Sequence, residues 1–199
     1  MSRDDDLAAV AAALGLSLDA AQRSTLLAYL ELLQRWNGTY NLTAVRDPAA
    51  MFTQHLADCL AVLPPLQRRA AGGRLLDVGS GGGLPGVVIA VVQAEWQVTC
   101  VDTVGKKMAF VRQAAGSLGL RNLHARHARV EALAEPAFDV ITSRAFASLA
   151  DFVAMTRKHL APAGLWMAMK GKVPDDEIAA LPADIDVFHV EQLQVPGLD

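Results

Sequence analysis

The stretch of this chain whose residues most clearly suggest chemistry is LLDVGSGGGLPG, residues 75–86, in which five of twelve residues are glycine. An apolar run precedes it and another follows it, so we expect it where a strand turns into a helix. Glycines at such a point let the backbone turn tightly and let a ligand approach without meeting a Cβ. The segment is therefore the first candidate for a binding site.

The spacing of these glycines distinguishes two classes of ligand. A dinucleotide-binding turn has the pattern G-x-G-x-x-G, with a pyrophosphate facing the N-terminus of the following helix. Gly79 and Gly81 fit its first two positions, but Leu84 occupies the third. The chain instead reads Asp77-x-Gly79-x-Gly81-x-Gly83, the acidic pattern associated with S-adenosylmethionine. We expect Asp77 to accept a hydrogen bond from the ammonium group of that ligand, directly or through water.

A second carboxylate supports the same ligand. Asp102 ends the next expected strand, 23 residues beyond Gly79, where a carboxylate can accept from both ribose hydroxyls. Glycines recur in many turns, so the assignment depends on the glycines, Asp102 and the strand–helix setting together. This combination favours S-adenosylmethionine over a nucleotide as the cofactor.

Two methyl-transfer chemistries need residues that the sequence lacks at the required places. Methylation of an amino nitrogen on a base often uses an Asn/Asp-Pro-Pro-aromatic loop after the fourth strand, where this chain reads SRAF, residues 143–146. Methylation of a pyrimidine carbon needs a cysteine nucleophile, and neither Cys59 nor Cys100 lies in an expected loop. We therefore expect an acceptor that is nucleophilic without covalent help.

The elements expected to position these residues alternate between strand and helix from residue 74 onward. Expected strands cover residues 74–80, 97–102, 123–130, 138–144, 165–171 and 186–195, and expected helices cover residues 84–93, 106–119, 148–160 and 175–181. This alternation predicts an α/β fold with a doubly wound, mostly parallel sheet. In such a sheet ligands bind beyond the carboxyl ends of the strands, where the glycine turn lies.

Two helices are expected before the sheet. The first covers residues 19–36, with Ser17 as its cap and Asn37–Gly38 as its end. The second covers residues 47–63 and is expected to end at Pro64–Pro65, because proline breaks a helix interior.

Composition indicates one packed domain. The chain has 199 residues, of which 52% are hydrophobic and 20% charged. We interpret residues 1–70 as a helical extension packed on the sheet and residues 71–199 as the cofactor-binding core. The sequence shows no secretory signal and no apolar run long enough to cross a bilayer, so we expect a cytoplasmic protein without a membrane partner.

Positive charge is concentrated in one part of a chain whose net charge is −3. The segment 103–130 contains no acid but holds Lys106, Lys107, Arg112, Arg121, Arg126 and Arg129. Charge alone leaves two interpretations open, a solvated helix surface or a face that contacts nucleic-acid phosphates.

Several motifs, taken in order, resemble one family. RWNGTYNLTAVRDP, HLADCL, LLDVGSGGGLPG, VDTVGKKMAFVRQ, ARVE, ITSRAFASL and MKGK are similar to the bacterial small-subunit ribosomal RNA (guanine-N7) methyltransferases, also called glucose-inhibited division protein B. The resemblance extends from about Leu26 to Asp199. It implies a Rossmann-like class I S-adenosylmethionine-dependent fold and methyl transfer to guanine N7 of one nucleotide in the 530 hairpin of 16S rRNA. Members of this family continue into a last antiparallel strand that this sequence does not contain.

The resemblance also implies roles for individual residues. Carried over by motif, cofactor contacts fall on Gly79, Leu84, Val130, Glu131 and Arg144. The Val130 N–H and Glu131 would read the adenine edge, and we expect Arg144 to help orient the guanine, for example through O6. The resemblance favours RNA contact for the basic segment, with 16S rRNA or the small ribosomal subunit as the partner and a monomer as the oligomeric state.

Three polar residues are candidates for contact with the substrate, each with a structural alternative. Asn41 and Arg46 lie in a loop that opens toward the expected site, and they either meet the substrate or fix the extension against the sheet. Lys170 closes the fifth expected strand on the ligand side, where it either holds a phosphate or is a solvated strand end.

Aromatic and histidine candidates also have two interpretations. Phe146, Tyr40 and Trp36 are candidates to stack on the base, although packing between elements is the commoner role. His55 and Asp58 supply two ligands at helical spacing, too few for a metal site, so capping or a buried hydrogen bond is favoured and no metal is expected. Two rival functions remain: a methyltransferase of this fold acting on another RNA, a protein or a small molecule, and a non-catalytic binding module.

Overall fold

The computed structural model describes residues 2–135, 137–144 and 146–198. Within them one sheet contains five strands, all paired in parallel: β1 (Gly73–Val78), β2 (Trp96–Asp102), β3 (Leu123–His127), β4 (Phe138–Ser143) and β5 (Leu160–Ala168). Their order is β3-β2-β1-β4-β5, so the chain reverses its direction of travel across the sheet after β3. The predicted α/β fold with a doubly wound sheet is confirmed.

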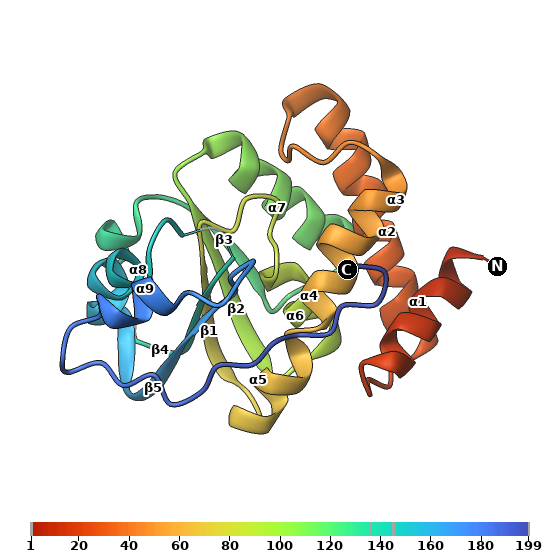
Figure 1. Ribbon diagram of the computed structural model, residues 1–199. Coiled ribbons are helices and arrows are strands. Elements are labelled where there is room, and N and C mark those ends of the chain that lie inside the picture. The colour runs from red at the N-terminus through yellow and green to blue at the C-terminus, as the bar shows by residue number, and fades with distance from the viewer. Residues whose placement is uncertain (1, 136, 145, 199) are drawn as a thin grey trace.

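Helices cover both faces of the sheet (Figure 1). Helices α6 (Gly86–Val92) and α7 (Gly105–Ser117) pack on one face, whereas α8 (Leu149–Thr156), with α9 (Asp175–Ala179) beside it, packs on the other. The consecutive residues Leu75 and Leu76 of β1 belong to different hydrophobic clusters, because successive side chains of a strand point to opposite faces. Since both faces are covered, the apolar residues of β1 form a continuous run.

The N-terminal helices add a further layer over α6 and α7. They are α1 (Arg3–Ala13), α2 (Ala20–Tyr40), α3 (Pro48–Met51), the π-helical segment η1 (Phe52–Ala57), α4 (Asp58–Leu60) and α5 (Leu63–Arg69). Helix α2 contacts both α6 and α7, and the buried residues of the extension share one hydrophobic cluster with them. The division of the chain near residue 70 stays an interpretation.

Helix α2 corrects two expectations. Its cap is Asp19, which forms a capping box with Gln22, and not Ser17. The helix continues through Asn37–Gly38 to Tyr40. The Asn37 side-chain amide does not break the helix, because it donates to the Val45 carbonyl in the loop beyond the helix at 3.0 Å. Helix α1, which was not expected, begins at a capping box between Ser2 and Asp5.

The proline pair also differs from the expectation. Pro64–Pro65 lies in the first turn of α5, where the missing N–H groups would have no helical partner. The helical segment before it already ends at Leu60, so the proline pair begins a helix and does not end the one expected over residues 47–63.

The strand expected at residues 186–195 is wrong. This segment joins no ladder in the part of the chain that the structure describes, and a strand requires a hydrogen-bonded neighbour. It runs beside α5 toward α4 (Figure 1), where Glu191 pairs with Arg68 at 2.6 Å and the Phe188 ring lies under Arg69. Side-chain contacts with α5 thus replace strand pairing.

No helix among the described residues has the length and apolar character needed to cross a membrane.

Candidate functional site

The glycine turn follows β1 directly, as expected. Gly79 and Gly81 have φ angles of 67° and 57°, a conformation that residues with a side chain rarely adopt. A Cβ at either position would meet nothing within 4 Å. These glycines are therefore needed for the backbone path, and the space above them is open to a ligand.

Asp77 lies beneath the turn and is completely buried. Its Oδ2 accepts from the Gly86 N–H at 2.8 Å, which fixes the start of α6. A Cβ on Gly86 would lie 2.9 Å from that oxygen and 2.6 Å from Cys100 Sγ, so only glycine permits this approach. Burial raises the pKa of the Asp77 carboxyl to about 7, although the Gly86 N–H and the Arg144 charge act in the opposite direction.

Asp102 ends β2 beside the same turn. One of its carboxylate oxygens accepts from the Gly81 N–H at 3.0 Å and the other from the Val104 N–H at 2.9 Å. The Lys107 ammonium lies 3.9 Å from the first of these oxygens. Asp102 thus shapes the turn, and each oxygen keeps a lone pair with which it can accept from a ribose hydroxyl.

Helix α2 supports the turn from the side of the extension. The Tyr29 hydroxyl donates to the Gly82 carbonyl at 2.7 Å, and a Cβ on Gly82 would lie 3.0 Å from a methyl group of Leu33. The extension therefore forms part of the site wall through Tyr29 and Leu33, which were not among the predicted site residues.

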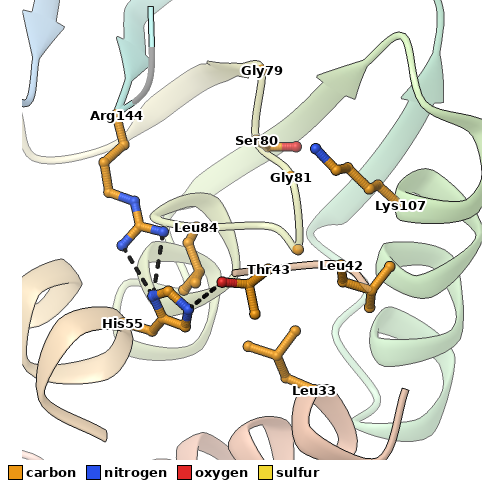
Figure 2. A pocket seen from close by; sticks show the side chains of 11 residues that line it. Leu33, Leu42, Thr43, His55, Gly79, Ser80, Gly81, Leu84, Lys107 and Arg144 are labelled. Atoms are coloured by element: carbon orange, nitrogen blue, oxygen red, sulfur yellow. Dashed lines mark hydrogen bonds between the residues drawn. The ribbon is translucent and has the colours of Figure 1, made fainter. Parts of the chain in front are cut away.

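A pocket opens where the turn meets the extension (Figure 2). Its lining combines backbone of the glycine turn, apolar side chains and polar groups of the extension, α7 and β4: Leu33, Leu42, Thr43, His55, Gly79, Ser80, Gly81, Gly82, Leu84, Lys107 and Arg144. Gly79, Gly81, Leu84 and Arg144 are thus brought together, as the sequence predicted. Thr43, Leu33 and Leu42 were not among the predicted site residues.

Arg144 follows β4 and reaches across the pocket to η1 and α4. Its Nη1 donates to the Gln54 carbonyl at 3.0 Å and lies 3.3 Å from Asp58 Oδ2. Both terminal nitrogens lie 3.5 Å from His55 Nδ1. The residue therefore connects the core to the extension at the wall of the pocket.

His55 and Thr43 continue this network. His55 is 5% exposed, and its Nε2 lies 2.9 Å from Thr43 Oγ1. Burial and the nearby Arg144 charge lower the pKa of the imidazole. The buried hydrogen bond predicted for His55 is confirmed, and among the described residues no group of three or more potential ligands could hold a metal ion.

Val130 and Glu131 lie outside the pocket lining, on the 3-10 turn η2 (Val130–Ala132) that follows β3. Val130 is buried in the hydrophobic cluster beneath α8, and His159 Nε2 lies 2.7 Å from its carbonyl oxygen. The Glu131 side chain is exposed. Their contact with an adenine ring therefore stays a prediction.

The polar substrate candidates each have an intramolecular partner. Arg46 donates to Asn41 Oδ1 at 2.6 Å, and Asn41 ends α2 in the left-handed conformation. Lys170 pairs with Glu177 of α9 at 2.7 Å and is not a solvated strand end. These contacts account for local structure, and contact with RNA remains a prediction for all three candidates.

The aromatic candidates differ in exposure. Phe146 packs on Phe152 of α8 with ring centroids 5.4 Å apart, and Trp36 packs on Phe110 at 5.5 Å. Tyr40 is 44% exposed at the end of α2. Packing between elements is therefore the observed contact of Phe146 and Trp36, and Tyr40 packs on Trp36 with ring centroids 5.0 Å apart.

The basic segment lies on α7, β3 and their flanking loops. Lys107 pairs with Asp102, and Arg126 pairs with Glu135. Among the described residues no ion pair is made by four further members: Lys106, Arg112, Arg121 and Arg129. These four residues are exposed, two on α7 and two in the loops that precede and follow β3.

The site fits the predicted cofactor in its polar groups. Among the described residues four buried side-chain atoms have no hydrogen-bond partner: Asp77 Oδ1, Ser80 Oγ, Gln93 Nε2 and Ser143 Oγ. Asp77 and Ser143 belong to the carboxyl ends of adjacent strands, and Ser80 lies in the glycine turn. Buried polar atoms are normally satisfied, and Asp77 Oδ1, which as a carboxylate oxygen only accepts, lacks a hydrogen-bond donor, although Asp77 does not itself line the pocket. An ammonium group beside Asp77 would supply that donor.

Comparisons with known proteins agree with this geometry. Residues 22–199 match the family described as GidB, rRNA small subunit methyltransferase G. Proteins named ribosomal RNA small subunit methyltransferase G from Acidovorax sp. (strain JS42) and Leptothrix cholodnii are each 64% identical to this chain. The alignments cover 94% and 98% of this chain and 86% and 90% of those proteins.

Two solved structures share the fold with TM-scores of 0.51. Coclaurine N-methyltransferase, bound to N-methylheliamine and S-adenosylhomocysteine, is 14% identical over 71% of this chain and 43% of its own. A putative S-adenosylmethionine-dependent methyltransferase from Methanococcus maripaludis is 14% identical over 70% and 61%. At such identities the likeness concerns the fold alone, whereas the sequence matches place this chain in the rRNA small subunit methyltransferase G (GidB) family.

Proposed function

We propose that this chain transfers a methyl group from S-adenosylmethionine to guanine N7 of one nucleotide in the 530 hairpin of 16S rRNA. The observation that carries the proposal is the family match over residues 22–199. The named activity of the relatives, rRNA small subunit methylation, supplies the substrate class. The open glycine turn above a buried carboxylate is consistent with the cofactor.

The cofactor would be held by groups near the carboxyl ends of the strands. Backbone of Gly79 and Gly81 would pass beside the methionine portion, and the unpaired Asp77 Oδ1 would accept from its ammonium group. Asp102 would accept from the ribose. Leu84 lines the same pocket, and we expect Val130 and Glu131 to meet the adenine.

The proposed acceptor needs little from the protein beyond position. Bound S-adenosylmethionine supplies an electrophilic methyl group on a sulfonium. Guanine N7 carries an in-plane lone pair and no proton, so no general base is required, and the positive charge moves from sulfur to the imidazole ring without being created. Holding two reactants in line can lower the barrier by about 7–11 kcal/mol.

Arg144 is the residue best placed to orient the base. It lines the pocket with Gly79 and Leu84 and is held by Asp58 and the Gln54 carbonyl. A bidentate grip on guanine O6 and N7 is common in recognition, but it would block the attacking atom here. We therefore assign it a contact with O6 or with the cofactor, never with N7.

The exposed basic residues of α7 and of the loops that flank β3 would contact RNA phosphates. A base in a stem must be exposed or flipped to reach a pocket, whereas a loop base is already nearly free. Phosphate contacts on this face would hold the hairpin while the target base enters the pocket. We further propose that the protein acts as a monomer in the cytoplasm.

The test is incubation of the purified protein with a deuterium-labelled methyl donor and three acceptors: 16S rRNA, small subunits, and transfer RNA as a control. Mass mapping of nuclease fragments should find one labelled methyl on a guanine of the 530 hairpin. Labelling of transfer RNA alone would favour another RNA substrate. Cofactor binding without transfer to any acceptor would favour the non-catalytic alternative.

A further inference from the structure

Three polar side chains form a row along the wall of the pocket. The Arg144 guanidinium faces His55 Nδ1, and His55 Nε2 faces Thr43 Oγ1 (Figure 2). His55 and Thr43 both line the pocket, and neither has a role in the function proposed above.

Arg144 fixes the direction at His55. Guanidinium nitrogens only donate, and both terminal nitrogens lie 3.5 Å from His55 Nδ1. A proton on His55 Nδ1 would face the N–H groups of the positively charged Arg144 guanidinium, so two donors would point at each other. The Gln54 carbonyl lies 3.1 Å from Nδ1 and accepts from Arg144 Nη1 at 3.0 Å. Its second lone pair can also accept a proton from Nδ1, so the preference for a bare Nδ1 rests on the positive charge and the donating nitrogens of Arg144. Burial and Arg144 lower the pKa of the ring, and the hydrogen bond to Gln54 opposes them with a smaller effect. We therefore assign to His55 a neutral ring with its proton on Nε2.

His55 in turn fixes the direction at Thr43. The Thr43 hydroxyl oxygen accepts from the Val45 N–H at 3.2 Å, and His55 Nε2 lies 2.9 Å away. In the assigned tautomer the His55 Nε2–H donates to this oxygen as well. Two donors occupy both lone pairs of a hydroxyl oxygen. The remaining hydroxyl proton has to be donated elsewhere, and Thr43 lines the pocket.

We propose that Thr43 is a ligand-binding residue whose hydroxyl donates to an acceptor oxygen in the pocket, and that His55 is the positioning residue that fixes this polarity. Two oxygens of the proposed reaction share this chemistry, the α-carboxylate of the cofactor and O6 of the guanine. Because Lys107 and Arg144 place two cationic side chains around the same pocket, the carboxylate is the better match. The inference rests on the proposed function, which supplies both ligands.

The first test is calorimetric binding of S-adenosylhomocysteine to Thr43→Val, which keeps the shape of the side chain and removes the hydroxyl. Loss of a hydrogen bond to a charged acceptor should weaken binding about ten- to hundredfold. Thr43→Ser, which keeps the hydroxyl, should stay within about threefold of the unmodified chain. The matched control is Thr25→Val on α2, where the lost hydroxyl bonds only to the Ala21 carbonyl of its own helix.

A second arm distinguishes the two oxygens. If the acceptor is the carboxylate, Thr43→Val will not change affinity for the decarboxylated cofactor analogue. If the acceptor is guanine O6, Thr43→Val will leave S-adenosylhomocysteine affinity intact and lower kcat/KM for rRNA methylation. If Thr43→Val changes neither the affinity for S-adenosylhomocysteine nor kcat/KM, the proposal is overturned. If the unmodified chain itself does not bind S-adenosylhomocysteine, the proposed function fails instead.

The role of His55 has its own readout. Long-range 15N–1H correlation spectra at neutral pH distinguish the two neutral tautomers from the protonated ring. We expect the Nε2–H tautomer, and in Arg144→Met we expect a shift toward Nδ1–H. An Nδ1–H or doubly protonated His55 in the unmodified protein would overturn the assigned polarity.

Discussion

Replacing Asp77 by asparagine isolates the cost of keeping a carboxylate completely buried beneath the glycine turn. Burial raises its pKa from 3.8 to about 7 in the folded chain. Between these two values the folded state holds a proton that the unfolded state has lost, so the free energy of unfolding falls as pH rises. A pKa shift of one unit corresponds to about 1.4 kcal/mol, so the raised pKa of Asp77 lowers the free energy of unfolding by about 4 kcal/mol at high pH. About 3 kcal/mol of this loss develops between pH 5 and pH 8.

Asp77→Asn removes this dependence while leaving an oxygen that can accept from the Gly86 N–H. Urea unfolding followed by circular dichroism at pH 5 and pH 8 measures the free energy of unfolding of both proteins. The value for the variant minus the value for the unmodified chain should be about 3 kcal/mol larger at pH 8 than at pH 5. The control is Asp176→Asn, which removes an exposed carboxylate on α9. An equal difference between Asp77→Asn and the unmodified chain at both pH values would refute the argument.

Three further changes test other parts of the site. Gly86→Ala should lower the free energy of unfolding by about 1–3 kcal/mol, because its Cβ would overlap buried atoms; an unchanged thermal midpoint would contradict the stated contact. Arg144→Ala removes charge-assisted hydrogen bonds and should lower rRNA methylation kcat/KM about tenfold or more, so unaltered turnover with unaltered cofactor affinity would exclude its proposed role. The last change replaces four basic residues with alanine: Lys106, Arg112, Arg121 and Arg129. It should reduce the slope of log affinity for rRNA against log salt concentration by about 3. An unchanged slope would show that RNA does not bind at these residues.

The sheet and the glycine turn could be predicted because both depend on local sequence. Short apolar runs alternating with helical segments fix a parallel sheet, and the carboxyl ends of its strands then bring Asp77, Gly79 and Asp102 to one edge. Glycines in unusual number indicated the positive φ angles at Gly79 and Gly81. Neither inference required knowledge of distant contacts.

The rest of the site depends on contacts between distant residues. Thr43 meets His55 across 12 residues, and His55 meets Arg144 across 89, so no local pattern reveals the row that they form. The only signal available was that all three residues fall within motifs shared with the family. The same limit explains the wrong strand at residues 186–195, where alternating apolar residues satisfied the strand pattern but no neighbouring strand among the described residues pairs with them.

The central claim is that the glycine turn after β1 holds S-adenosylmethionine for transfer. Isothermal titration of S-adenosylhomocysteine into the purified chain tests it most directly, with comparison of Asp77→Asn. We predict one molecule bound per chain and weaker binding by the variant, because the ammonium group loses a charged acceptor. Absence of binding by the unmodified folded chain would contradict the account.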